Sequence, residues 1–161
     1  MTTPLSRPEV VINYSPKLDL HITLLAVQGY GRVALPDYRF EMDCRLQHPT
    51  GSFSYSANDL YFDLESFERF STELQGVQQG LRQEAALKDA GQMVVLRLEG
   101  NSRALQATLE VREYLAPSMA KLNATFEVDY DLFVNKLRGE INRFIEELRN
   151  VEPSNPEWAE L

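Results

Sequence analysis

The sequence has little of what metal sites and disulfide-stapled scaffolds are built from. Its 161 residues include one cysteine, Cys44, and two histidines, His21 and His48. A single cysteine forms no internal disulfide, so nothing indicates a small stapled extracellular domain. Two histidines far apart in the chain, with no cysteine or further histidine nearby, lack the ligand spacing of a zinc site. We therefore expect no metal site and no cofactor.

Glycine-rich and nucleophile motifs are missing as well. The Gly-Tyr-Gly segment at 29–31 is too short for a dinucleotide fingerprint, and no P-loop is present. Ser52, Ser54 and Ser56 alternate along one segment, and none lies in a G-x-S-x-G elbow. The sequence thus contains no nucleophile in a recognisable catalytic setting.

Carboxylates are the remaining candidates for acid–base chemistry. Asp59, Asp63 and Glu65 lie close together in sequence, as do Asp129 and Asp131. Asp63 is expected to cap a helix, Glu65 to lie in its first turn, and one of the other two aspartates to cap a second helix. With structural roles for these groups and no partner group evident, we expect no catalytic residue and no enzyme activity.

Long hydrophobic runs and an excess of positive charge are also absent. No apolar segment approaches the roughly 20 residues of a membrane-spanning helix. Residues 1–16 lack the continuous apolar core of a signal peptide, so a cytoplasmic protein is expected. The 24 acidic and 16 basic residues give a formal net charge of −8. Such a surface is repelled by nucleic acids and anionic lipids and attracted to basic partners, although the charge also serves solubility alone.

What the sequence does contain is a repeated strand pattern. Polar and apolar residues alternate, which indicates strands with one buried and one solvated face in antiparallel sheets. Cys44 shares the apolar face of its segment and is expected to behave as a small buried hydrophobe. His21 lies on a polar face, and His48 lies in a turn. Strands are expected at 18–27, 38–46, 53–57, 94–98, 105–111 and 122–128.

Two segments change from the strand period to a helical one. Apolar residues recur three and four positions apart after Asp63, up to about Gly80, and again after Asp129 or Asp131. Each pattern gives one apolar stripe. The stripes consist of Phe67, Phe70, Leu74 and Val77 in the first helix, and Phe133, Val134, Leu137, Ile141, Phe144, Ile145 and Leu148 in the second.

The expected fold is α+β, with about six antiparallel strands and two helices in the order βββ-α-βββ-α. The strands form either a sandwich, which is slightly preferred, or one curved sheet. We expect a flexible N-terminal arm at 1–17, one domain at 18–149 and an acidic tail at 150–161, in which Trp158 is free to dock onto the body. Two segments stay open: 10–12 is an edge strand or part of the arm, and 81–90 is helix, strand or loop.

This order of elements resembles a bacterial family. From about Leu18 to Leu148, a strand meander leads into Asp-Leu-Glu-Ser-Phe-Glu-Arg-Phe, and three strands ending in Leu-Asn-Ala-Thr-Phe-Glu-Val-Asp lead into the last helix. The pattern is similar to that of small domains grouped around WapI-type immunity proteins, which are encoded beside polymorphic toxins. The resemblance implies a protein that works by binding, and it supplies no catalytic residues.

The leading functional hypothesis is therefore a non-catalytic domain that sequesters one basic protein partner, in the manner of an immunity protein. The alternative is a small-ligand-binding or regulatory domain with an apolar pocket between sheet and helix. A homodimer through an edge strand is a third hypothesis. Neither nucleic acid nor membrane is expected as a partner.

Overall fold

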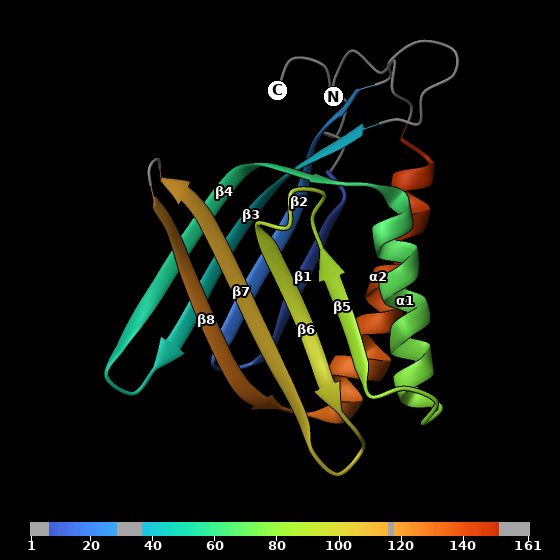
Figure 1. Ribbon diagram of the computed structural model, residues 1–161. Helices are drawn as coiled ribbons and strands as arrows, with labels where there is room; N and C mark the ends of the chain where they lie inside the picture. The colour runs from blue at the N-terminus through green and yellow to red at the C-terminus, as the bar shows by residue number, and fades with distance from the viewer. Residues whose placement is uncertain (1–6, 29–36, 116–117, 152–161) are drawn as a thin grey trace, which may run out of the picture.

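The fold consists of two four-stranded antiparallel sheets and two helices. A computed structural model describes residues 7–28, 37–115 and 118–151 (Figure 1). The first sheet is a meander of β1 (Glu9–Ser15), β2 (Leu18–Gln28), β3 (Asp37–His48) and β4 (Gly51–Phe62). The second is a meander of β5 (Glu84–Lys88), β6 (Val94–Gly100), β7 (Leu105–Leu115) and β8 (Ser118–Val128).

A helix follows each meander, so both halves of the chain have the order of four strands and one helix. Helix α1 (Leu64–Gln78) follows β4, and α2 (Leu137–Arg149) follows β8 after a π-helical segment, η1 (Asp131–Lys136). Neither helix within the described ranges is long and apolar enough to cross a membrane.

The α+β class and the antiparallel sheets are confirmed, whereas the six-strand count is wrong. Glu9–Ser15, within the expected N-terminal arm, forms β1 and pairs with β2. Glu84–Lys88, within the segment that stayed open, forms β5 and pairs with β6. The order is therefore ββββ-α-ββββ-α, in two sheets rather than one curved sheet. Most of the expected tail, including Trp158, lies outside the described residues.

Helix α1 begins as its sequence predicts, whereas α2 begins at Leu137 after the π-helical segment and has no side-chain cap. Asp63 is the N-cap of α1, and its carboxylate accepts the amide of Ser66 at 2.8 Å. Gly80, with φ of +71°, follows the C-cap Gln79. At the second helical segment Asp129, rather than Asp131, accepts the amide of Leu132 at 3.0 Å.

The helices lie side by side and close one side of the sandwich (Figure 1). Helix α1 packs beside β5, and α2 packs against α1 and β1. Four aromatic rings join the helices to the first sheet, with ring centroids 5.1 to 6.0 Å apart. They belong to Phe40, Phe62, Phe67 and Phe144, all of which are fully buried. The space between this sheet and the helices is therefore filled by side chains.

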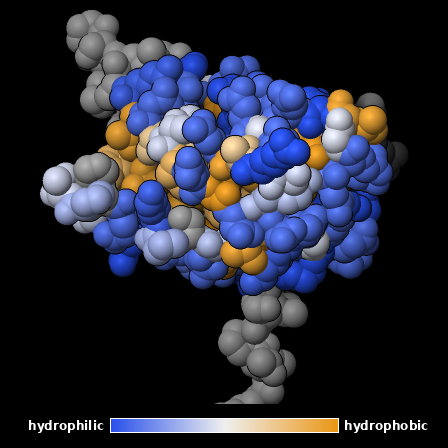
Figure 2. Space-filling view, turned by 90° about the horizontal axis from the view of Figure 1, so that it is seen from below, coloured by the Kyte–Doolittle hydropathy of each residue, from blue (hydrophilic) through white to orange (hydrophobic). Residues whose placement is uncertain are grey.

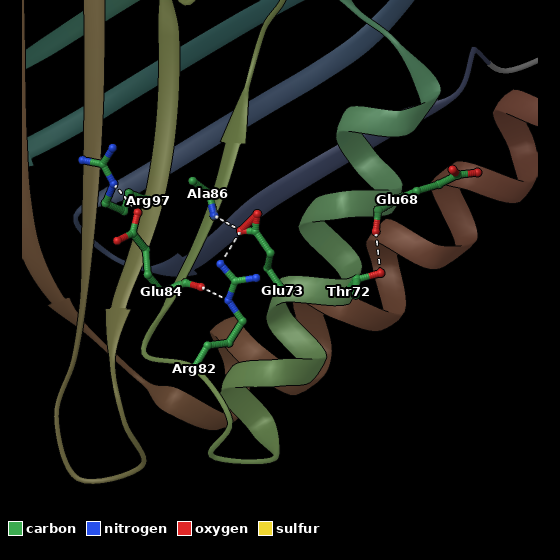
Figure 3. A network of polar contacts seen from close by, with 7 residues as sticks. All are labelled: Glu68, Thr72, Glu73, Arg82, Glu84, Ala86 and Arg97. Atoms are coloured by element: carbon green, nitrogen blue, oxygen red, sulfur yellow. Dashed lines mark hydrogen bonds and ion pairs between the residues drawn. The ribbon is translucent and has the colours of Figure 1, made fainter.

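Helix α1 also covers the free edge of β5 (Figure 3). The amide of Ala86 donates to Glu73 Oε2 of α1 at 3.3 Å, and the Arg82 guanidinium lies 3.6 Å from the same oxygen. Arg82 Nε donates to the Glu84 carbonyl at 3.1 Å. An edge strand otherwise presents unpaired backbone groups that invite further pairing. The side chains of Glu73 and Arg82 supply partners for this edge.

Gly139 offers a direct test of the exposed helical position that the structure gives it in α2. It lies exposed in the interior of α2, and a Cβ added there would meet nothing within 4 Å. We expect Gly139→Ala to raise the free energy of unfolding by about 0.5–1 kcal/mol, because alanine loses less backbone entropy on folding. Urea unfolding of both proteins measures this, and a destabilised variant would contradict the described environment.

Candidate functional site

The side of the sandwich away from the helices has an incompletely covered hydrophobic interior. Inward-facing hydrophobic residues of β2, β3, β6 and β7 are buried. Those of β8 and of the Gly51–Asn58 part of β4 are only partly buried, although they pack against the same core, whereas Leu60 and Phe62 at the far end of β4 are buried. We call these residues the β4/β8 cleft. It consists of Phe53, Tyr55 and Ala57 of β4 and Leu122, Ala124, Phe126 and Val128 of β8.

The cleft follows from the placement of the helices. Each helix has one apolar stripe, and both stripes face the side formed by β5 and β1 (Figure 1). Edges β4 and β8 lie on the opposite side, where no described helix covers them. Seen from the lower end of the sheets, hydrophobic side chains are visible between polar borders on that side (Figure 2). Exposed apolar patches with polar rims are typical of interaction sites.

Strand β4 is a long edge strand with few charged residues. It is 12 residues long, and its Gly51–Asn58 segment carries no charge. Natural edge strands are commonly short, charged or covered, because a long uncharged edge invites pairing with another chain. At the far end of β4 the Ala90 amide donates to the Tyr61 carbonyl at 2.7 Å.

A polar hollow of about 530 Å³ borders β4 on the outer face of the first sheet. It is open to solvent and spans all four strands of that sheet. Its lining residues are Glu9, Asp19, His21, Thr23, Asp43, Cys44, Arg45, Ser54 and Ser56.

His21 occupies this hollow between two carboxylates. Its Nδ1 lies 2.7 Å from Glu9 Oε1, and its Nε2 lies 2.9 Å from Asp19 Oδ1. The hydrogen bond with Glu9, together with the charge of Asp19, raises the pKa of the imidazole above its ordinary 6.5, although partial burial opposes the rise. The ring therefore carries a positive charge over a wider pH range than a free histidine.

A short acidic stretch lies on the outer face near the middle of β4, between Arg45 and Arg39 of β3. Asp43 of β3 pairs with Ser56 of β4, and the serine hydroxyl donates to Asp43 Oδ1 at 2.5 Å. Glu41 precedes Asp43 by two residues and therefore lies on the same face of β3. It stands beside the bulge of β4 that contains Asp59. The Asp43 carboxylate has capacity for further hydrogen bonds, since one carboxylate accepts several.

The lower end of the second sheet is acidic too. A hollow of about 730 Å³ lies where β6 and β8 end and where β7 and η1 begin. Its charged lining residues are Glu99, Arg103, Glu127, Asp129 and Asp131. Val128, which closes the β4/β8 cleft at that end, also lines this hollow. The cleft therefore has acidic surface on both sheets.

Cys44 lies in the core, as the sequence predicts. It is 2% exposed, and burial, with a smaller contribution from the charge of Asp19, raises the pKa of its thiol to about 12. A thiol that stays protonated and buried is a poor nucleophile and a poor metal ligand.

The carboxylates that the sequence offered for acid–base chemistry do not come together in one site. They bind backbone amides or neighbouring side chains instead. Asp63 caps α1, Asp129 accepts the amide of Leu132, Glu65 pairs with Arg69 at 2.9 Å, and Asp131 accepts the Asn135 side-chain amide at 3.2 Å. Among the described residues, no group of three or more histidine, cysteine, aspartate or glutamate side chains is placed to hold a metal ion. The side chain of His48 lies outside the described residues.

Comparison of the chain with protein-family models, with curated proteins and with solved structures gives no match. The case for a function is therefore made from the geometry of the described residues.

The functional candidates that the sequence did not single out are the residues of the β4/β8 cleft. Alternation assigns Phe53 and Phe126 to inward faces, but it gives no information on whether another layer covers them. One signal was present in the sequence: Ser52–Ser56 alternates serine with aromatic residues, and the Gly51–Asn58 segment contains no charge.

His21 gives a testable pH dependence. A raised pKa in the folded state contributes stability that is complete below the unfolded pKa of about 6.5 and is lost as pH rises through the folded pKa. We expect the unfolding free energy of the wild type to fall relative to His21→Gln between about pH 6 and about pH 8. Parallel stability curves for the two proteins over this range would contradict the described contacts. NMR titration of the His21 ring, identified with His48→Gln, gives the pKa directly.

Proposed function

We propose that the protein is a non-catalytic binding domain that holds one basic protein partner on the open side of its sandwich. The observation that supports this most strongly is the β4/β8 cleft, an incompletely covered hydrophobic surface with acidic groups on both flanks. Interfaces combine a desolvated apolar centre with a polar rim. The resemblance to WapI-type immunity proteins agrees with such a role, in which the partner is a toxin that the domain sequesters.

The charge distribution favours a basic partner. The formal net charge is −8, while several basic side chains are already engaged within the protein. Arg112 and Lys121 bind Glu110, and Arg149 binds Glu68 and Glu146. Around the cleft, acids such as Asp43 and Glu127 face solvent. Complementary charge mainly raises association rates and excludes wrong partners, while the apolar centre supplies affinity.

A second candidate function, small-ligand binding, is favoured by the same cleft. The pocket expected between sheet and helix is occupied by Phe40, Phe62, Phe67 and Phe144. An apolar molecule would instead lie between β4 and β8. Native mass spectrometry of the purified protein distinguishes this function, because a bound small molecule adds a defined mass.

Salt-dependent capture tests the proposed function. Tagged wild type is compared with a triple variant, Glu41→Gln, Asp43→Asn and Asp59→Asn, in lysate of the native host at low and high salt. We expect one basic protein to be retained at low salt and released at high salt, with weaker retention by the variant. The captured protein is then purified, and its affinity is measured by calorimetry.

A matched control replaces acids on the helix side, Glu65→Gln, Glu146→Gln and Glu147→Gln, which changes the net charge equally. Equal loss of binding in both triple variants would show a general charge effect and contradict a site at the open side. The purified partner should bind the wild type more weakly at high salt, and it should bind the first triple variant more weakly than the wild type. If its affinity changes in neither case, the proposal that charge attracts the partner is wrong.

A further inference from the structure

The free edge of β4 has the properties of a strand-addition site. It bounds the first sheet, it is long, and Gly51–Asn58 carries no charge that would oppose a neighbouring strand. The edge of β5 provides the internal comparison, since α1 covers it with Glu73 and Arg82 (Figure 3). No described strand or helix performs that role for β4.

We propose that an extended segment of the basic partner adds to β4 as a further antiparallel or parallel strand, with apolar side chains in the β4/β8 cleft and lysine or arginine side chains over the outer face. This inference rests on the proposed function and specifies the chemistry of the partner segment. The segment alternates apolar and basic residues, because successive side chains of a strand point to opposite faces.

The inward-facing side chains of such a segment would cover the partly exposed part of the hydrophobic core. An added strand lies about 4.8 Å beyond β4, on the side where Phe53 and Tyr55 are only partly buried. Its inward side chains would lie between these residues and Phe126 of β8. Burying apolar surface there contributes about 25 cal/mol per Å² before the ordering of the segment is counted.

The outward-facing side chains of such a segment would meet acidic groups near the middle of β4. Asp43 lies opposite Ser56, and the short serine leaves the carboxylate accessible from the β4 side. Glu41 and Asp59 lie beside the bulge that follows. Arg45 lies opposite Ser54 and Arg39 opposite Tyr61, one on each side of these acids. Basic side chains are therefore favoured near Ser56 and the bulge, which gives the site a preferred register.

The same charges argue against a second copy of this chain. Pairing β4 with β4 of another molecule would place Asp43 and Asp59 of both copies around one interface. Like charges brought together cost free energy, and the net charge of each copy adds to the repulsion. A basic segment turns the same groups into attractive ones.

The test uses labelled synthetic peptides and the full chain. The probe alternates valine and lysine over the length of Gly51–Asn58. One control alternates valine and glutamate, and another carries the probe's residues in two blocks. Fluorescence anisotropy gives the dissociation constants. We expect the alternating basic peptide to bind at least about tenfold more tightly than either control.

Variants place the peptide on β4. Phe53→Lys puts a charge on the inner face of the edge and should abolish measurable binding, as inward charges do in natural edge strands. Its matched control is Leu81→Lys, at a residue 79% exposed between α1 and β5. Asp43→Asn should weaken binding of the basic peptide about two- to fivefold, while Glu65→Gln on α1 should leave it unchanged. Ser56→Lys should also weaken binding of the basic peptide. Because Ser56 is exposed, this variant serves as the test if Phe53→Lys does not fold.

Hydrogen exchange of the wild type locates the peptide without any substitution. We expect added protection in β4 amides and none in β5. The proposal is overturned if the basic and acidic peptides bind alike, if Phe53→Lys and Ser56→Lys bind as the wild type does, or if protection appears elsewhere. It is also overturned if the wild type is a dimer that Phe53→Lys dissociates, because a second copy then occupies β4.

Failure of this inference is distinguishable from failure of the proposed function. If Phe53→Lys still captures the basic host protein with unchanged affinity, the binding function holds and the β4 site is wrong. If neither the wild type nor any variant captures a basic protein, the proposed function itself is wrong.

Discussion

Two helices, each with a single apolar stripe, have to cover a sandwich that has two open sides. Both stripes are used on the side of β1 and β5, where Phe67 and Phe144 pack onto Phe40 of the first sheet. Glu73 then covers the edge of β5 by accepting the Ala86 amide. The opposite side has no third helix among the described residues, so the inner faces of β4 and β8 stay partly exposed. The asymmetry of helix coverage thus creates the cleft.

The fold could be predicted from the sequence where the spacing of hydrophobic residues alone distinguishes strand from helix. Strict alternation gave the inward faces of β3 and β7, and the three- and four-residue spacing gave both helices, with Asp63 as a cap. Strands β1 and β5 stayed open because they are short and owe their stability to pairing with β2 and β6. Such pairing is a tertiary interaction that propensity does not show.

The candidate site was less predictable, because what distinguishes its residues is that no further layer of the fold covers them. Cys44 was correctly assigned to the core from its neighbours on one face. Phe53 and Phe126 carry the same alternating pattern as fully buried residues, and only the arrangement of layers separates the two cases. The contacts of His21 with Glu9 also depend on the register of β1 against β2, which no local pattern gives.

Amide hydrogen exchange of the free protein, resolved by residue with NMR, tests the central claim most directly. The account predicts slow exchange for Ala86 on the covered edge of β5 and fast exchange for the amides of Gly51–Asn58 that point away from β3. Uniformly slow exchange along β4 in a monomeric sample would contradict it, because that edge would then be covered.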